Sequence, residues 1–259
     1  MDLLHTVAGL FVGFVVGMTG VGGGSLMAPI LILLFGVAPT TAVGTDLWFA
    51  AITKTVGGAI HYRKGGAELA IVRRLCYGSL PASVLTAWVL FRTESAQIRG
   101  GMMMHALGIV LLLTAVATLF RHRLQAANRS VRIETAQRFI RWQPALTVVA
   151  GALLGVMVTL TSVGAGALGA TMLLALYPLQ LTPRKLVGTD IVHAVPLTLV
   201  AGLSHLWVGN VDFALLGNLL LGSIPGIAAG SLLANRVPNR ILQPLLSIVL
   251  VFAGYRLLA

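Results

Sequence analysis

Charged residues are scarce in this chain, and their scarcity excludes a soluble globular protein. Only 10% of the 259 residues are Asp, Glu, Lys or Arg, whereas 57% are hydrophobic and the mean hydropathy is +0.93. A soluble domain of this size needs more polar surface to cover its core. Long stretches lack charge altogether: 3–45, 100–120, 142–183, 191–211 and 213–235.

Each uncharged run reaches the roughly 20 apolar residues that a helix needs to cross a hydrocarbon core about 30 Å thick. A membrane β-barrel would alternate polar and apolar residues along each strand, and these runs do not alternate. The sequence therefore predicts an all-α polytopic membrane protein in contact with the lipid bilayer.

Acidic residues and cysteine are also rare. Seven acidic residues against 18 basic ones give a net charge of +11. The basic residues lie in short segments between apolar runs, which is typical of membrane topology and not of a nucleic-acid-binding face. Cys76 is the only cysteine, which excludes an intrachain disulfide or a multi-cysteine metal site. We expect no nucleic-acid partner, no metal and no cofactor.

Catalytic motifs are missing as well. The chain contains no H-E-x-x-H and no G-x-S-x-G pattern, and no cluster of acids with histidine in one segment, so an intramembrane enzyme is disfavoured. The stretch 164–169 fits G-x-G-x-x-G, but it lies inside a hydrophobic run and not between a strand and a helix. We therefore reject a dinucleotide site. The first five residues lack the basic region of a signal peptide, so we expect them to lead directly into a membrane segment.

What the chain does have is an internal repeat with an offset of 144 residues. Val43-Gly44-Thr45-Asp46 recurs as 187–190, and Gly78-Ser79-Leu80-Pro81 recurs as 222–225 with one substitution. Upstream, Val21-Gly22-Gly23-Gly24 matches 163–166 at an offset of 142. The pattern predicts a first transmembrane repeat in 1–120 and a second in 144–259, joined by a basic cytoplasmic linker, 121–143.

Each repeat is predicted to hold five segments. They are 4–19, 25–37, 47–61, 70–91 and 101–120 in the first, and 144–161, 166–178, 187–206, 213–234 and 241–258 in the second. An odd number of segments makes the second repeat enter the membrane from the opposite side, so the repeats are expected to be inverted. The segments after each glycine-rich stretch are short, and whether they cross the membrane or re-enter is left open.

Positive charge supports this topology independently. The loops 62–74, 121–143, 179–186 and 235–240 fall on one side and carry 14 of the 18 basic residues. Cytoplasmic loops concentrate Lys and Arg, so we expect both termini outside the cytoplasm. The linker is either a helix lying on the anionic leaflet or a solvated connector.

The strongest functional feature is the glycine-rich break after the first helix of each repeat. Short, glycine-interrupted segments at matching positions of inverted repeats indicate a substrate site near the midplane. Glycine lets backbone N–H groups approach a ligand, and a helix starting there points its positive end at the break, which suits an anion. The candidate substrate-binding residues are Thr19, Gly22, Gly23, Gly24 and Ser25, Thr161, Ser162, Gly164, Ala165 and Gly166, Thr45, Asp46, Thr189 and Asp190, and Lys54 and His193.

Several of these residues have a second interpretation. Thr45-Asp46 and Thr189-Asp190 are expected to precede helices, where they would be N-caps, complete the anion site, or do both. Lys54 is either the counter-charge of the anion or a snorkelling side chain. The glycines spaced by four in 9–17 and 222–230 favour close helix packing, and His61 and His205 are expected near the membrane interface.

The motifs resemble a known family. The stretch 13–26, with Val43-Gly44-Thr45-Asp46 and 58–62, resembles the sulfite exporter TauE/SafE family of membrane transporters. The resemblance implies transport of small sulfur-containing anions, such as sulfite or organosulfonates, across the bacterial inner membrane. In the second break Ala165 replaces a glycine and Thr159 stands at the position of Gly17, so the two half-sites are expected to be unequal.

The sequence therefore predicts a secondary transporter, and not an enzyme, that exports a small anion by alternating access between the two breaks. An anion channel is the nearest alternative and an intramembrane enzyme a more distant one. A proton-coupled mechanism through Asp46, Asp190 or His193 is left open, as is the oligomeric state.

Overall fold

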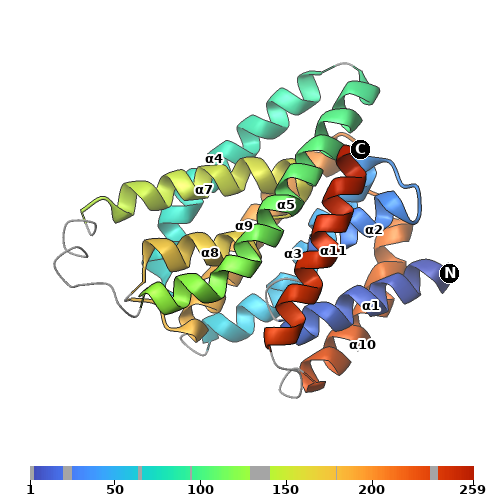
Figure 1. Cartoon of the computed structure of the whole chain (residues 1–259). Helices are drawn as coiled ribbons and strands as arrows, with labels where there is room; N and C mark the ends of the chain where they lie inside the picture. Colours follow the sequence, from blue (N-terminus) through green and yellow to red (C-terminus); the bar gives the residue numbers. More distant parts are fainter. Residues whose placement is uncertain are drawn as a thin grey trace.

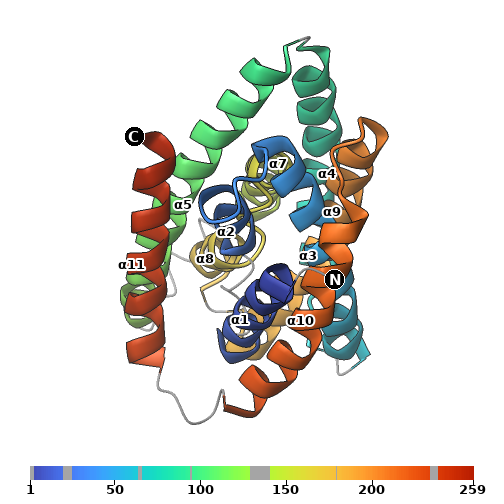
Figure 2. The same ribbon diagram turned by 90° about the vertical axis from the view of Figure 1, so that its right-hand side faces the viewer.

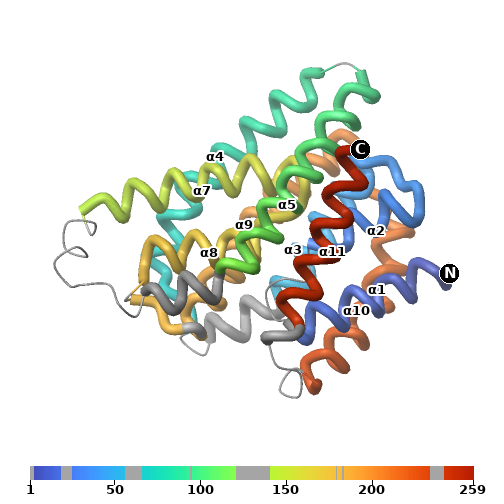
Figure 3. Tube along the Cα trace, in the orientation of Figure 1, coloured from blue at the N-terminus to red at the C-terminus, as the bar shows by residue number. Residues whose placement is uncertain are grey.

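A computed structural model describes the backbone of residues 3–19, 25–63, 66–93, 95–128, 141–178, 180–233 and 239–259. Side chains are described in these ranges apart from Thr19, 56–63, 121–128, Pro183 and 239–241, as the coloured trace in Figure 3 indicates. Every long regular element in this part of the chain is an α-helix. The helices are α1 (Leu3–Thr19), α2 (Met27–Leu33), α3 (Pro39–Arg63), α4 (Leu69–Arg92), α5 (Ala96–Asn128), α7 (Gln143–Thr161), α8 (Ala167–Leu176), α9 (Pro183–Trp207), α10 (Phe213–Leu233) and α11 (Asn239–Leu258).

The ten predicted segments correspond to these ten helices, but the short ones are shorter than expected. α2 has 7 residues and α8 has 10, which at 1.5 Å per residue makes them about 10 and 15 Å long. Neither is long enough as a helix to cross about 30 Å of hydrocarbon. α5 is longer than predicted and continues to Asn128, and most of the predicted linker (129–140) lies outside the described residues.

The third helix of each half begins earlier than predicted. α3 starts at Pro39 and α9 at Pro183, because proline at the first helical position loses no hydrogen bond and has the required φ. Thr182 caps α9 by accepting a hydrogen bond from the Lys185 backbone N–H at 3.4 Å. The motif residues Thr45-Asp46 and Thr189-Asp190 therefore lie inside helices, and the prediction that they precede helices as N-caps is wrong.

The helices pack in pairs, each of which joins the first half of the chain to the second. α1 lies beside α10, α4 beside α7, α3 beside α9 and α5 beside α11. Figure 1 shows α4 beside α7 and α5 beside α11, and Figure 2 shows α2 and α8 in the middle of the surrounding longer helices. α2 contacts α3 and α11, and α8 contacts α5, α7 and α9.

Glycine makes two of these pairs very close. A β-carbon on Gly9, Gly13 or Gly17 of α1 would collide with the α10 backbone, and one on Gly222, Gly226 or Gly230 would collide with α1. Gly78, Gly151 and Gly155 hold α4 against α7 in the same way. The packing interpretation of both glycine stripes is confirmed.

The outside of the molecule is apolar over much of its surface. Large hydrophobic side chains are exposed on many helices, including Trp207 (92%), Leu232 (78%) and Leu3 (77%). Within the described residues, Ala96–Phe120, Gln143–Thr161, Arg184–Trp207 and Phe213–Leu233 are long and apolar enough to span a bilayer. Such a surface requires lipid around it, because the interior and the exterior are both hydrophobic.

Candidate functional site

The second break is a tight turn of residues 162–166 between α7 and α8. Ser162 ends α7 in the left-handed conformation, with φ of 60°, and Gly164 and Gly166 have φ of 124° and 152°. Side chains larger than hydrogen are strained at such φ values, which explains why the break contains glycine. The backbone turns sharply enough to bring α8, which starts at Ala167, next to the end of α7.

Lys54 of α3 reaches this break from the other half of the chain. Its Nζ donates a hydrogen bond to the Ala165 backbone oxygen at 2.5 Å. Its charge interacts with the carboxylates of Asp190 and Asp46. The ammonium therefore lies at the break instead of extending to a membrane interface, which leaves counter-charge as the interpretation that fits its position.

Asp46 approaches the same break from α3. Its carboxylate is fully buried and faces the Ser162 hydroxyl, the charge of Lys54 and the Ala28 backbone in the first turn of α2. Neither carboxylate oxygen of Asp46, nor Ser162 Oγ, has a hydrogen-bond partner in good geometry among the described residues. Buried polar groups are rarely left this way, and the Ser162 hydroxyl and the Ala28 backbone are the neighbours that act on the Asp46 carboxylate as hydrogen-bonding groups.

Asp190 of α9 lies on the other side of Lys54. Its side chain is 1% exposed, and a β-carbon on Gly169, in the first turn of α8, would collide with Asp190 Oδ1. Each aspartate of the repeated motif is thus next to the first turn of a short broken helix, Asp46 beside α2 and Asp190 beside α8. Three charged groups, one ammonium and two carboxylates, meet around the second break.

His193, one turn after Asp190, joins the site to α4. Its ring is fully buried, and Nε2 is 2.9 Å from Ser79 Oγ. Lys54 also acts electrostatically on this ring. His193 therefore belongs to the same cluster, and Ser79 holds its orientation.

The two threonines of the repeated motif join the halves of the molecule. Thr45 Oγ1 accepts a hydrogen bond from the Asp212 backbone N–H at 3.1 Å, and Thr189 Oγ1 accepts one from the Glu68 backbone N–H at 3.0 Å. Both threonines are fully buried. Their hydroxyls are used at the starts of α10 and α4, and they do not turn toward the break.

Of the remaining candidate substrate-binding residues, the structure describes some and leaves others outside the described part of the chain. Thr161 is buried and accepts a hydrogen bond from the Val163 N–H at 3.1 Å, which stabilises the turn. Ser25 is buried just before α2. Gly22, Gly23 and Gly24 lie outside the described residues, and so does the side chain of Thr19.

His205, in the last turn of α9, is covered by α4 and α7. It is fully buried, with Nε2 3.0 Å from the Thr159 backbone oxygen and the ring edge-on to Phe91. The prediction that His205 lies near the membrane interface stays a prediction. The prediction for His61 concerns a side chain outside those described.

Two residues of the site were not predicted from the sequence. Gly169 allows Asp190 to approach α8, and its only signal was its place as the last glycine of the rejected G-x-G-x-x-G pattern. Ser79 supports His193, and its signal was the repeated Gly-Ser-x-Pro motif. In the described part of the chain, no group of three or more His, Cys, Asp or Glu residues is arranged to hold a metal ion.

Comparison with known proteins identifies the family of this chain. The family model described as sulfite exporter TauE/SafE matches residues 5–257, almost the whole chain. The chain belongs to the TauE/SafE family. As a member of this transporter family it is a multi-pass membrane transporter with a small substrate, and not an enzyme.

Two relatives in Bacillus subtilis (strain 168) span nearly the same length. The chain is 39% identical over 259 residues to the "Probable membrane transporter protein YjnA", with all of both chains covered. It is 27% identical over 247 residues to the "Probable membrane transporter protein YdhB", covering 95% of this TauE/SafE member and 96% of the relative. No solved structure matches the chain.

Proposed function

We propose that this TauE/SafE member exports a small anion, sulfite or an organosulfonate, by alternating access through a site at the glycine breaks. The observation that carries the proposal is the Lys54 ammonium, which extends from the first half of the chain onto the backbone of the second break. A half-buried lysine at a break in the helices gives an anion a counter-charge where the backbone is exposed.

The surroundings of Lys54 supply the other contacts that an oxyanion needs. The Ser162 hydroxyl faces the Asp46 carboxylate, and α8 begins five residues later. The first backbone N–H groups of a helix have no partner inside the helix and carry partial positive charge. In α8 the Gly169 N–H already donates to the Gly164 backbone oxygen, so an oxyanion beside Ser162 would accept hydrogen bonds from the N–H groups before Gly169 and pair with Lys54.

The two carboxylates repel an anion unless one of them is protonated when the anion binds. With Asp46, Asp190 and Lys54 all ionised, the cluster carries one net negative charge, which repels an anion in a low-dielectric site. A proton on Asp46 or Asp190 removes this repulsion. Binding of the anion together with a proton is therefore the form of coupling that these residues favour.

We also propose that residues 1–120 and 144–259 are inverted repeats joined by the cytoplasmic linker 121–143. Reciprocal contacts support the proposal. Gly9 meets Leu219 where Gly151 meets Leu75, and Thr45 pairs with Asp212 as Thr189 pairs with Glu68. Exchanging the halves converts each contact into the other, as expected for elements related by a two-fold axis.

We propose that the protein lies in the bacterial inner membrane with both termini outside the cytoplasm, and the distribution of positive charge supports this orientation. The side that carries 14 of the 18 basic residues is the cytoplasmic side. The negative interior of the cell then drives an anion outward, which favours export. An anion channel uses the same site, and kinetics separate the two possibilities.

The test is anion flux into proteoliposomes that contain the purified protein, measured for sulfite, sulfate, a sulfonate and a carboxylate, with and without a pH gradient. We expect saturable flux that prefers a sulfur oxyanion and responds to the pH gradient. Flux proportional to concentration, with ohmic current, would support the channel. Folded protein that moves none of the four anions would contradict the proposal.

A further inference from the structure

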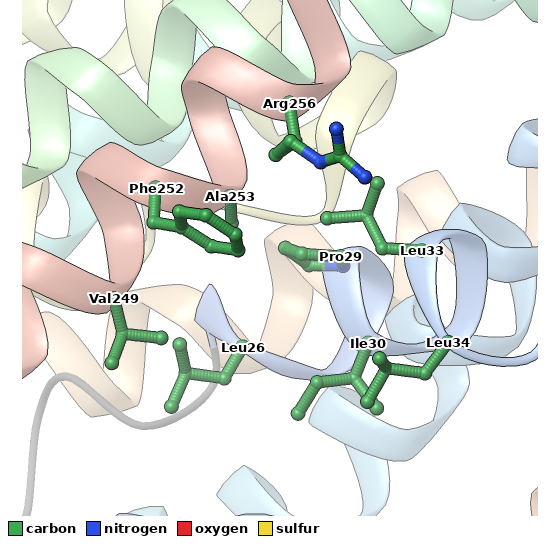
Figure 4. Close-up of a pocket in the computed structure, with 9 residues that line it drawn as sticks. All are labelled: Leu26, Pro29, Ile30, Leu33, Leu34, Val249, Phe252, Ala253 and Arg256. Atoms are coloured by element: carbon green, nitrogen blue, oxygen red, sulfur yellow. The ribbon is translucent and has the colours of Figure 1, made fainter.

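A groove on the outside of the molecule, where the first half meets the second, is separate from the charged cluster. It has a volume of about 360 Å³ and lies between α2 and α11. Figure 4 shows its lining, which is apolar apart from the guanidinium of Arg256 at one end. The lining residues are Leu26, Pro29, Ile30, Leu33, Leu34, Val249, Phe252, Ala253 and Arg256.

The groove follows from the shortness of α2. α11 has 20 residues and α2 only 7, so α2 covers a small part of the α11 face that points toward it. Leu26 and Ala253 form a buried floor, at 3% and 6% exposure, whereas Leu34 and Phe252 are 75% and 64% exposed at the walls. The groove is thus open on its outer side, where the surface of the molecule is apolar.

We propose that this groove binds one acyl chain of an anionic phospholipid, whose phosphate pairs with Arg256. An apolar channel that opens to the bilayer takes a hydrocarbon chain, because its walls bury apolar surface on contact. A guanidinium at its end binds the planar array of phosphate oxygens through two N–H donors. Arg256 forms no ion pair with any described residue, so its charge is available to the lipid.

The direction of the groove fits the orientation of a lipid. Arg256 lies in the last turn of α11, and Val249 lies seven residues earlier, about 10 Å deeper along the helix. Arginine near a helix end belongs at headgroup depth, with the apolar residues before it in the hydrocarbon. The bound chain then packs on Leu26, next to the first glycine break, and supports α2 where α11 does not reach it.

The experiment is native mass spectrometry of the full-length protein after incubation with phosphatidylglycerol or phosphatidylcholine of identical acyl chains. We expect the unsubstituted protein to retain about fivefold more phosphatidylglycerol, which corresponds to the ~1 kcal/mol that one basic residue contributes near an anionic surface. Arg256→Gln should reduce this ratio to about one. Ala253→Trp, which fills the groove, should reduce retention of both lipids.

Arg92→Gln is the matched control. Arg92 is also an exposed arginine in the last turn of a helix, but it lies over the Trp88 ring, away from the groove. It should leave the lipid ratio unchanged. An unchanged ratio in Arg256→Gln would overturn the proposed phosphate contact, and unchanged retention in folded Ala253→Trp would overturn the groove as the lipid site.

Discussion

At the scale of single residues, the second break brings together three charged side chains, those of Lys54, Asp46 and Asp190. Lys54 interacts electrostatically with both Asp46 and Asp190, and charges inside a membrane protein are costly unless they serve a function. The two halves are not equal here, because Thr198 stands at the position in the second half that Lys54 occupies in the first. Thr198 donates its hydroxyl hydrogen to the Ala194 carbonyl, at 2.8 Å, and carries no charge.

Replacement of Lys54 by Met should therefore reduce anion flux strongly. Loss of a hydrogen bond from a charged group is worth about 1.5–3 kcal/mol, or about 10- to 150-fold in affinity, and we expect the apparent KM for the anion to rise by that order. Thr198→Val should change it little. Initial rates in proteoliposomes over a range of anion concentration measure both effects, and equal KM values for the two variants would exclude Lys54 as the counter-charge.

At the scale of helices, glycine decides which pairs can form. α10 contains a matched pair of glycines: Gly222, whose added β-carbon would collide with the Thr6 backbone oxygen of α1, and Gly217, which has open space around it. Small residues at such crossings let membrane helices approach closely, since no hydrophobic force drives them together inside lipid. The α1–α10 pair thus depends on Gly222 and not on Gly217.

Gly222→Ala should destabilise the protein by about 1–3 kcal/mol, the usual cost of overpacking. Gly217→Ala should be neutral or stabilise the helix by up to about 1 kcal/mol, because alanine has the higher helix propensity. Unfolding by a denaturing detergent, followed by circular dichroism, compares the two. Equal destabilisation by both substitutions would mean that close contact is not what Gly222 provides.

At the scale of the whole molecule, two equivalent hydrogen bonds hold the halves together at opposite ends of the α3–α9 pair. At one end, the hydrogen bond from the Glu68 N–H to Thr189 is accompanied by an ion pair between the Glu68 carboxylate and Lys185. At the other end, the Asp212 carboxylate forms no such ion pair across the halves among the described residues, and its Oδ1 accepts a hydrogen bond from the Leu215 N–H. The ion pair is 42% and 38% exposed. Exposed pairs contribute about 0–1 kcal/mol, so the threonine bonds are the stronger links.

Thr189→Val and Thr45→Val should destabilise the protein by similar amounts, about 1–3 kcal/mol each, because each leaves a backbone N–H unsatisfied. Glu68→Gln should cost less than either. The same detergent unfolding assay tests all three variants. If the two threonine variants differ by several kcal/mol, the two halves do not hold each other reciprocally, and the proposed repeat symmetry loses its main structural support.

Much of the helical architecture was predictable because it depends on local pattern. Apolar segments with few or no charges located the ten described helices, and glycines spaced by four identified the faces of α1 and α10 that pack together. Helix starts were predicted less well: Pro39 and Pro183 start α3 and α9, but Gly-Thr-Asp was interpreted as the start in each case. Threonine and aspartate favour caps in isolation, and a proline one to two turns earlier outweighs that preference.

The sequence by itself determined that this chain is a membrane protein of the TauE/SafE family, because hydrophobic runs and glycine motifs are properties of neighbouring residues. Only the tertiary structure decided that Lys54 reaches Ala165, that Ser79 orients His193, and that His205 is buried. Each of these contacts joins residues more than 40 positions apart. Such contacts depend on how separate helices cross, and local pattern carries no information on the crossing.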